Sequence, residues 1–385
     1  MNDRSVQNGY FRFFNRIEKA RFISRPNRFI VICETGGKKV EAFLPNPGRL
    51  MELLLPDATL FLERSNVETR KTSYTAVAVE RDGVPVMVHT HRTNDVAQAL
   101  IMDNLIPQLA GSRIIRREVK VHSSRLDFLL EKGGAPLYLE VKSCTLFGKN
   151  SAMFPDAVTA RGKRHVEELI ELGKSGNRCA ILFVIQWVES DIFSPDYHTD
   201  IEFAKTFLSA RGQVMLIPAA VSWKNDLTLK RQVKILKIPW DTIEQEAKDR
   251  GSYLLICRLN NDAYLEAGKL GTLHLRKGFY VYVGSGKKDL LSRINRHRRK
   301  RKKMFWHIDY LLEKGKLLAE LPVRTRDDIE CLMANSLRNM AAGMVNGFGS
   351  SDCACPSHLF YFPTLPLSSR DFQELVQYFR MDRIF

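Results

Sequence analysis

The chain has 385 residues, of which 44% are hydrophobic and 26% are charged, and its formal net charge is +16. The composition excludes an intrinsically disordered protein, and the length predicts two or three globular domains. The longest uninterrupted apolar run, Cys179 to Ile185, has seven residues, and no transmembrane segment is expected because a spanning helix needs about 20. The positive charge favours a polyanionic partner, with nucleic acid preferred over a membrane surface.

The N-terminal residues and the cysteines bear on the compartment. The opening residues, MNDRSVQNGYFRFF, lack the basic, apolar and small-residue order of a secretory signal. The seven cysteines are odd in number, and Cys33, Cys179 and Cys257 lie in strand-like runs where a buried thiol is expected. Both features favour a cytoplasmic protein with reduced thiols.

Residues 1–92 are predicted to form an OB-like β-barrel. Turn signals such as ETGG, PNPGR and RDGVP separate short apolar segments, namely RFIVIC, KVEAFL, TLFLE and TAVAVE. The opening run interleaves aromatic residues with basic ones: Phe11, Phe13, Phe14, Phe22 and Phe29 with Arg12, Arg16, Arg21, Arg25 and Arg28. Single-strand-binding barrels use such a run for stacking and phosphate contact, so Arg12, Arg25 and Arg28 are candidate nucleic-acid-binding residues. Aromatic residues that simply fill the barrel core are the alternative.

Residues 93–244 carry a pattern that predicts an α/β domain. A helix-spaced segment, NDVAQALIMDNLIPQL, precedes three strand-like runs, RIIRREVKV, SRLDFLL and APLYLEV. A second helical segment, PDAVTARGKRHVEELIELG, and a buried-type strand, CAILFVIQW, complete the order α-β-β-β-α-β. A further helix-strand pair, IEFAKTFLSARG and QVMLIPAAV, is expected to follow by right-handed crossover.

The hairpin SRLDFLLEKGGAPLYLEVKS carries charges in the middle of two apolar strands. If Leu130 pairs with Leu137, then Asp127 lies opposite Glu140, and Lys142 lies on the same face. Opposed like charges destabilise a sheet unless a cation lies between them or one acid is protonated. We expect Mg²⁺ or Mn²⁺ held by Asp127 and Glu140, with Lys142 orienting a water or stabilising charge on phosphorus. A solvated Lys–Glu surface pair is the alternative.

The spacing Asp-x12-Glu-x-Lys within this order resembles the core of the PD-(D/E)XK nuclease superfamily. More particularly, six segments resemble the sugar fermentation stimulation protein A (SfsA) family over about residues 10 to 240: RFISRPNRF, PNPGRLMELLLP, SRLDFLL, LEVKSCTL, FPDAVTARGKRH and LFVIQW. The resemblance implies an OB-fold barrel, a PD-(D/E)XK nuclease-like domain and DNA binding without strong sequence preference. It also implies a regulatory role in sugar (maltose) metabolism. The two resulting hypotheses are a metal-dependent nuclease and a non-catalytic DNA-binding regulatory factor.

A further acid often completes such sites. The candidates are Asp103, Glu118 and Asp156, and the residues do not decide among them. For Asp156, capping of a helix that begins near Ala157 is an equally good role.

Residues 245–385 are predicted to form a basic domain. From residue 251 onward 22 Lys and Arg stand against 13 acidic residues, a net charge of +9. Seven of these basic residues lie within eight positions: Arg296, Arg298, Arg299, Lys300, Arg301, Lys302 and Lys303. This run is a candidate phosphate-binding surface, and a solvated helix face is the alternative.

The same domain resembles the GIY-YIG nucleases, which implies an α+β GIY-YIG-like fold. The resemblance rests on GSY at Gly251, YVG at Tyr282 and the segment IECLMANSL. It implies catalytic roles for Tyr253, Tyr282, Arg293 and Glu330, with Glu330 as a metal ligand. The chain departs from the pattern by Ser252 in place of an aliphatic residue and by the 28 residues between the two tyrosines. GFGSSDCACPSHL resembles a GIY-YIG-like domain family over about residues 250 to 365.

Cys353, Cys355 and His358 form a C-x-C-x-x-H motif that offers three zinc ligands. No second Cys/His pair stands at ligand spacing, so zinc is not expected and a structural role is favoured.

Overall fold

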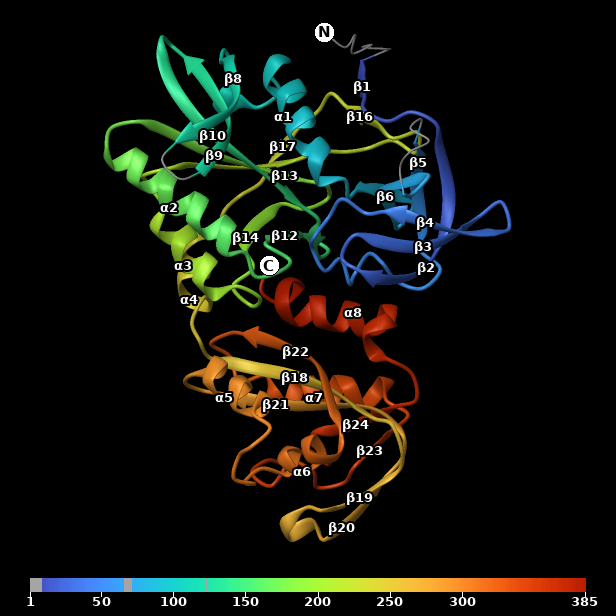
Figure 1. Cartoon of the computed structure of the whole chain (residues 1–385). Coiled ribbons are helices and arrows are strands. Elements are labelled where there is room, and N and C mark those ends of the chain that lie inside the picture. The colour runs from blue at the N-terminus through green and yellow to red at the C-terminus, as the bar shows by residue number, and fades with distance from the viewer. Residues whose placement is uncertain (1–8, 66–70, 122–123) are drawn as a thin grey trace. The chain divides into compact units, whose positions relative to one another are not determined.

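The computed structural model describes residues 9–65, 71–121 and 124–385, which fall into two compact units (Figure 1). The first unit consists of Met1–Asp196, Glu202–Trp240 and Phe385, and the second of Tyr197–Ile201 and Asp241–Ile384. The first eight residues, which enter the prediction on secretion, lie outside the described residues. Within the described ranges, no helix combines the length and hydropathy needed to cross a bilayer.

A closed barrel forms the N-terminal part of the first unit. Its strands are β2 (Ile17–Asn27), β3 (Ile30–Thr35), β4 (Lys38–Phe43), β5 (Thr59–Arg64), β6 (Tyr74–Arg81) and β7 (Val84–Met87). Their order is β4-β3-β2-β5-β6-β7, and parallel pairing of β4 with β6 closes the sheet. The predicted barrel is therefore confirmed. Phe11, Phe14 and Phe22 are buried, as the core alternative expected, whereas Phe29 is 48% exposed.

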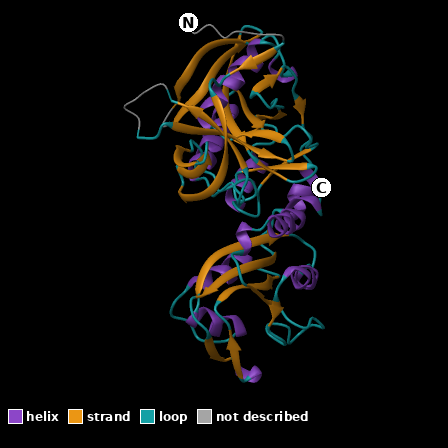
Figure 2. Ribbon diagram, turned by 90° about the vertical axis from the view of Figure 1, so that its right-hand side faces the viewer, coloured by secondary structure: helices purple, strands orange, loops and turns teal. Residues whose placement is uncertain are grey.

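The second sheet of this unit has the order β17-β15-β13-β10-β9-β8. Its strands are β8 (Arg113–Val121), β9 (Ser124–Lys132), β10 (Ala135–Cys144), β13 (Arg178–Ile185), β15 (Met215–Ala220) and β17 (Lys234–Ile235). The first three form an antiparallel meander, and β10, β13 and β15 run parallel. β13 is buried along almost its whole length, as expected for a central parallel strand. Figure 2 shows the twist of these strands in orange.

Small elements complete the first unit. Strands β11 (Leu146–Phe147), β12 (Ser151–Phe154) and β14 (Ile192–Pro195) form a three-stranded sheet. Strand β1 (Tyr10–Arg12) pairs with β16 (Thr228–Lys230).

Two helices pack against the second sheet, α1 (Thr93–Met102) and α2 (Ala160–Lys174), and α3 (Ile201–Ser209) precedes β15. The predicted order α-β-β-β-α-β is present, with two short strands added before α2. The first helix ends earlier than its apolar spacing predicted, because Asn104 has a left-handed backbone and Pro107 follows. The second begins later than predicted, with Thr159 as its N-cap. Asp156 therefore does not cap it, and that alternative was wrong.

The second unit is built on a five-stranded sheet of order β22-β18-β21-β24-β23. The strands are β18 (Gly251–Leu259), β21 (Gly278–Gly286), β22 (Lys316–Arg324), β23 (Gly343–Met344) and β24 (Leu359–Phe362). Helices α4 (Trp240–Glu246), α5 (Leu290–Arg298), α6 (His307–Lys314), α7 (Glu330–Met340) and α8 (Arg370–Gln377) accompany it. A hairpin, β19 (Ala263–Glu266) and β20 (Thr272–Leu275), is inserted between β18 and β21. Alternate residues of β18, such as Leu254 and Leu255, enter two separate hydrophobic cores.

Candidate functional site

A pocket of about 870 Å³ lies in the first unit at the open end of the β9–β10 hairpin, away from its Gly-Gly turn. Its walls come from the loop after β4, the start of α1, strands β9 and β10, and the segment that leads into α2. Its polar lining includes Arg25, Arg28, Asn46, Arg49, Asn94, Asp127, Glu140, Lys142, Asp156, Thr159, Arg161 and His165. The structure thus brings Asp127, Glu140 and Lys142 together.

The hairpin register agrees with the prediction over its regular part. Leu130 pairs with Leu137, and Phe128 pairs with Leu139. All four side chains are fully buried in one hydrophobic cluster. The regular pairing ends at this point, one residue before the two acids would oppose each other across the ladder.

The side chain of Asp127 replaces the backbone partner that a continued ladder would offer to β10. Its Oδ2 accepts a hydrogen bond from the backbone N–H of Val141 at 2.7 Å, and its Oδ1 accepts one from Asn94 Nδ2 at 2.7 Å. Burial and the neighbouring charge of Glu140 raise the pKa of Asp127 to about 6. The expected repulsion between the two acids is therefore present, although their direct pairing in the ladder is not.

Glu140 is 3% exposed and has two charged or ionisable neighbours. Its Oε1 lies 2.5 Å from Lys142 Nζ and 2.5 Å from His165 Nδ1. Burial alone would raise the pKa of Glu140, but Lys142 and His165 outweigh it and hold the pKa below its ordinary value. The second oxygen, Oε2, is buried and has no hydrogen-bond partner. This buried oxygen is therefore available to a cation or to a hydrogen-bond donor.

Asp156 is the candidate third acid that lines this pocket. Burial raises its pKa, while backbone hydrogen bonds from Leu50 and Arg49 oppose the shift. Its Oδ2 is buried without a hydrogen-bond partner. Gly48 lies against this carboxylate, and a Cβ at that position would stand 2.1 Å from Oδ2. A glycine is therefore required here for close approach.

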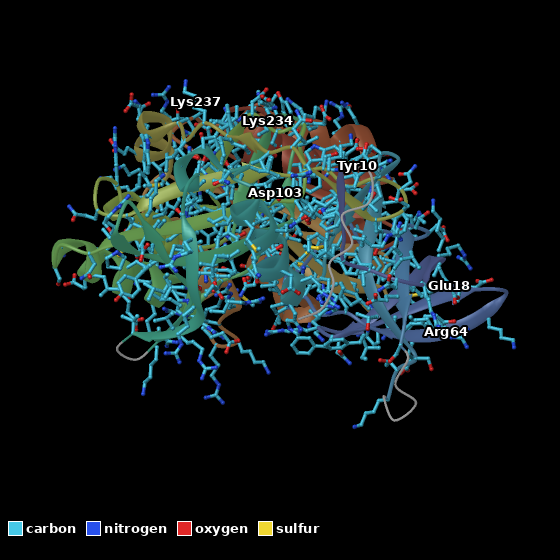
Figure 3. All side chains as sticks on the ribbon, turned by 90° about the horizontal axis from the view of Figure 1, so that it is seen from above. Tyr10, Glu18, Arg64, Asp103, Lys234 and Lys237 are labelled. Carbon is cyan, nitrogen blue, oxygen red and sulfur yellow. The ribbon has the colours of Figure 1, made fainter. Side chains whose placement is uncertain are left out.

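The other two candidate acids do not line the pocket. Asp103, labelled in Figure 3, forms an ion pair with Arg231 at 2.5 Å. Glu118 is exposed on β8 and pairs with Arg125 at 3.0 Å. Of the three candidates, Asp156 is therefore the one that lines the pocket.

The predicted basic residues of the barrel differ in their surroundings. The guanidinium of Arg25 donates to four backbone carbonyls, those of Arg28, Asn46, Gly48 and Arg49, at 2.7 to 2.9 Å. It thereby fixes the loop that forms one wall of the pocket. Arg12 lies 3.8 Å from Asp226, outside the pocket. Arg28 is exposed at the rim, together with Arg49 and Arg161.

Sequence reasoning missed Asn94 and His165, which hold the two acids in place. Asn94 stands in a helical segment that was interpreted from its apolar spacing. His165 ends the segment FPDAVTARGKRH, which was used for the family resemblance without a role being assigned to the histidine. No local signal identifies Asn94, because its partner lies 33 residues further along the chain.

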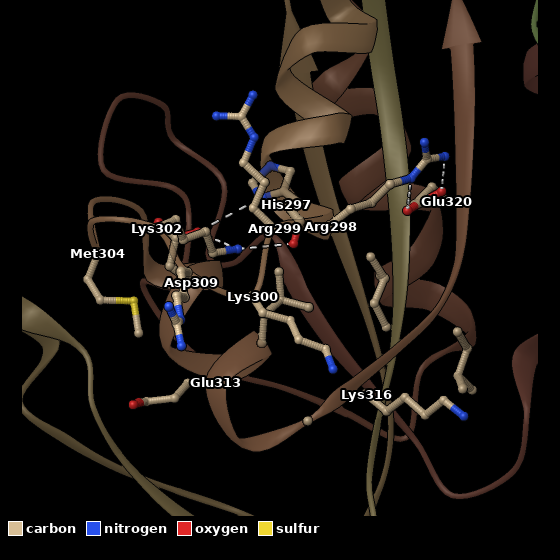
Figure 4. A pocket seen from close by; sticks show the side chains of 15 residues that line it. His297, Arg298, Arg299, Lys300, Lys302, Met304, Asp309, Glu313, Lys316 and Glu320 are labelled. Carbon is tan, nitrogen blue, oxygen red and sulfur yellow. Dashed lines mark hydrogen bonds and ion pairs between the residues drawn. The ribbon is translucent and has the colours of Figure 1, made fainter.

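The basic run of the second unit lies beside a pocket of about 780 Å³ (Figure 4). Arg296 and Lys302 pair with the buried Asp309, and Arg298 makes two hydrogen bonds to Glu320 at 2.6 Å. The remaining members are Arg299, Lys300, Arg301 and Lys303, which are exposed and form no ion pair within the described part of the chain. The run is thus divided into three anchored and four free cations.

The residues implied by the GIY-YIG resemblance come from β18, β21, α5 and α7. The hydroxyl of Tyr253 lies 2.9 Å from His297 Nε2, and the Arg293 guanidinium donates to the carbonyl of Ser285. Glu330 Oε2 accepts a hydrogen bond from Ser285 Oγ at 2.5 Å. Burial raises the pKa of Tyr253. Tyr282 and Glu330 add to this shift, and the charge of Arg293 opposes it. The four side chains, Tyr253, Tyr282, Arg293 and Glu330, therefore gather in one region.

The first unit is thus defined as an OB-type barrel joined to an α/β domain in which the half-buried Asp127 and the buried Glu140 lie close together on a hairpin. Residues 23–88 match the SfsA N-terminal OB domain, and residues 91–226 match the sugar fermentation stimulation protein RE domain. A sugar fermentation stimulation protein homolog of Moorella thermoacetica is 42% identical over 194 residues, covering 50% of this chain and 84% of the relative. The homolog of Methanothermobacter thermautotrophicus is 35% identical over 224 residues, covering 58% and 93%. The chain belongs to the sugar fermentation stimulation protein family.

A solved structure, that of Pyrococcus furiosus SfsA in complex with Ca²⁺, is 28% identical, with a TM-score of 0.55. The match covers 58% of this chain and 96% of the Pyrococcus chain. Residues 252–381 match a further family, the Domain of unknown function DUF123.

Proposed function

We propose that this chain binds DNA and hydrolyses phosphodiester bonds with the help of a divalent metal ion held by Asp127 and Glu140. The observation that carries the proposal is the pair of neighbouring carboxylates, Asp127 and Glu140, in a pocket rimmed by exposed arginines, with the buried oxygen Glu140 Oε2 lacking a hydrogen-bond partner. A buried carboxylate oxygen without a partner is costly unless a cation or donor satisfies it.

The donor set suits a hard divalent cation. Asp127, Glu140 and Asp156 offer carboxylate oxygens only, which Mg²⁺, Mn²⁺ and Ca²⁺ prefer over nitrogen or sulfur ligands. Two of these oxygens, Glu140 Oε2 and Asp156 Oδ2, lack hydrogen bonds. The relative from Pyrococcus furiosus was solved with Ca²⁺, another oxygen-seeking cation. We take Mg²⁺ or Mn²⁺ as the cofactor of the reaction.

Each neighbouring side chain has a role in this proposal. A bound divalent ion lowers the pKa of water and stabilises negative charge on a phosphate oxygen. Asn94 and the backbone of Val141 hold Asp127, and His165 holds Glu140. Lys142, 2.5 Å from Glu140, carries the positive charge that would meet the phosphate or the attacking water. This order of acids and lysine on adjoining strands supports a PD-(D/E)XK nuclease-like assignment.

The arginines at the rim would bind the DNA backbone. Arg28, Arg49 and Arg161 are exposed around the acids. Their guanidinium groups fit phosphates through paired hydrogen bonds. The second unit adds a basic surface with Arg299, Lys300, Arg301 and Lys303. We propose that this unit is GIY-YIG-like and contributes affinity for DNA.

A second function, a non-catalytic DNA-binding regulatory factor, is favoured by one observation. Lys142 and His165 already contact Glu140 and compensate its charge without a metal. In that case the acid pair would support only the shape of the pocket, and the arginines would bind DNA alone.

Cleavage assays distinguish the two functions. Single-stranded, duplex and branched DNA, and RNA, are incubated with the purified chain and Mg²⁺, Mn²⁺, Ca²⁺ or chelator. We expect Mg²⁺- or Mn²⁺-dependent cleavage that falls about 100-fold or more in Glu140→Gln. Glu131→Gln is the matched control, because Glu131 is a partly exposed acid on the same hairpin, paired with Arg113. Normal DNA binding without cleavage under all conditions would establish the regulatory factor instead.

A further inference from the structure

A cluster of three cysteines and one histidine lies in the second unit, whereas the proposed nuclease pocket belongs to the first. Cys353, Cys355 and His358 lie in the loop between β23 and β24, and Cys331 lies in the first turn of α7. One ligand atom from each of the four residues lies within 4.8 Å of those of the others. The fold thus supplies from a helix the fourth ligand that the loop sequence lacks.

The spacing of these atoms suits a tetrahedral metal ion. Cys353 Sγ lies 3.5 Å from His358 Nε2. A zinc ion with tetrahedral bonds of about 2.3 Å to sulfur and about 2.0 Å to nitrogen would separate the two atoms by about 3.5 Å. The other pairs of ligand atoms lie no more than 4.8 Å apart, and small side-chain rotations would bring them to the distances of a tetrahedral site. All three cysteines carry free thiols.

His358 is held so that one ring nitrogen faces the thiols. Its backbone N–H donates to Phe348 O at 2.8 Å, and its carbonyl accepts from Val283 N at 2.9 Å. The other ring nitrogen, Nδ1, lies 3.2 Å from Glu330 Oε1, although it is not aligned as a hydrogen bond. A carboxylate beside the outer nitrogen of a metal-binding histidine fixes the ring and raises its basicity. Glu330 stands in that position.

We infer that Cys331, Cys353, Cys355 and His358 bind one zinc ion, and that Glu330 orients His358. Four protein ligands of the Cys₃His type leave no open position, so the site is structural rather than catalytic. It ties the first turn of α7 to the loop before β24. Because Glu330 precedes Cys331 directly, the same link holds the Glu330 carboxylate beside Ser285.

The test measures metal content and coordination in the full chain, purified under reducing conditions. We expect one zinc per chain by mass spectrometry, and Co²⁺ should give the visible bands of a tetrahedral thiolate complex. Cys331→Ala should weaken Co²⁺ affinity at least about 10-fold, and alanine is well tolerated in a helix. Cys257→Ala is the matched control, because Cys257 is a buried thiol of the same unit outside the cluster. Its metal content should be unchanged.

A second variant addresses Glu330. Glu330→Gln should lower Co²⁺ affinity by about 10- to 100-fold and leave the thiolate bands in place, since the carboxylate acts through His358. Absence of stoichiometric zinc and of tetrahedral Co²⁺ bands in the wild-type chain would overturn the inference. So would unchanged affinity in Cys331→Ala, or a disulfide within the cluster in freshly reduced protein. DNA cleavage by the first unit does not enter any of these readouts.

Discussion

Replacement of Asp127 by asparagine is expected to stabilise the metal-free protein at neutral pH. Burial and Glu140 raise the pKa of Asp127 to about 6 from an ordinary value of 3.8. Each pKa unit corresponds to about 1.4 kcal/mol, so ionisation of this carboxyl at pH 7 costs the folded state about 3 kcal/mol. Asparagine removes that charge. Its Oδ1 can still accept from Val141, and its amide can donate to Asn94 once that side chain turns over.

The sign of the effect depends on pH. A raised carboxyl pKa means that the folded protein holds its proton more tightly than the unfolded chain, so wild-type stability falls as pH rises from about 4 to about 6. The gain in Asp127→Asn should therefore be absent near pH 4 and complete above pH 6. Added Mg²⁺ should reverse the ranking if it binds as proposed, because it would then stabilise only the protein that retains both acids.

Urea titrations followed by tryptophan fluorescence measure this difference. Trp306→Phe is introduced throughout, so that the signal comes from the three remaining tryptophans: Trp187, Trp223 and Trp240. Asp103→Asn is the matched control, because it removes an ion pair with Arg231 and should yield no gain. A gain of equal size at pH 4 and pH 7, or a loss at pH 7, would refute the reasoning.

Three further predictions concern other parts of the chain. Replacing the free cations Arg299, Lys300, Arg301 and Lys303 by glutamine should reduce the salt slope of DNA binding by about 0.9 for each phosphate that the variant no longer neutralises. Arg298→Gln, which removes a cation paired with Glu320, should change the slope less. A fourfold variant with the wild-type slope would show that the DNA binds elsewhere. Gly48→Ala should push the Asp156 carboxylate away, lowering the free energy of unfolding in urea by about 1–3 kcal/mol and lowering metal-dependent cleavage. Wild-type stability together with wild-type cleavage would contradict the close approach. Tyr253→Phe should lower the stability of the second unit by about 1 kcal/mol, because it removes the hydrogen bond to His297, and the unfolding midpoint of that unit should fall. Tyr264→Phe, at an exposed site, is the control and should leave the midpoint unchanged.

The hairpin shows why part of the candidate site could be predicted. The Leu130–Leu137 register follows from period-two alternation and a Gly-Gly turn, both of which are local properties of the chain. The same alternation places Asp127 and Glu140 near each other. It does not predict where regular pairing ends, because that depends on the carboxylate of Asp127 accepting from the backbone of Val141.

The residues that sequence reasoning missed depend on distant partners. Asn94, His165 and Cys331 each meet side chains from separate elements, so no spacing rule connects them to those partners. The predicted helix boundaries were wrong for a related reason. Apolar spacing continues past Met102 and begins before Ala160, whereas the backbone of Asn104 and the hydroxyl of Thr159 decide where the helices stop and start.

The β19–β20 hairpin has a consequence for how motif spacing is interpreted. It departs after Leu259 and returns at Gly278, two residues that are themselves paired across β18 and β21. Because both ends of the insertion meet at one rung of the ladder, its length can change while the strands that carry Tyr253 and Tyr282 keep their register. The 28 intervening residues therefore include an inserted hairpin, residues 260–277, rather than a change in the sheet. Leu265 and Leu275 of this hairpin are buried in the hydrophobic core beside β18, so a fluorescent label or an affinity tag belongs at its exposed tip, near Lys269.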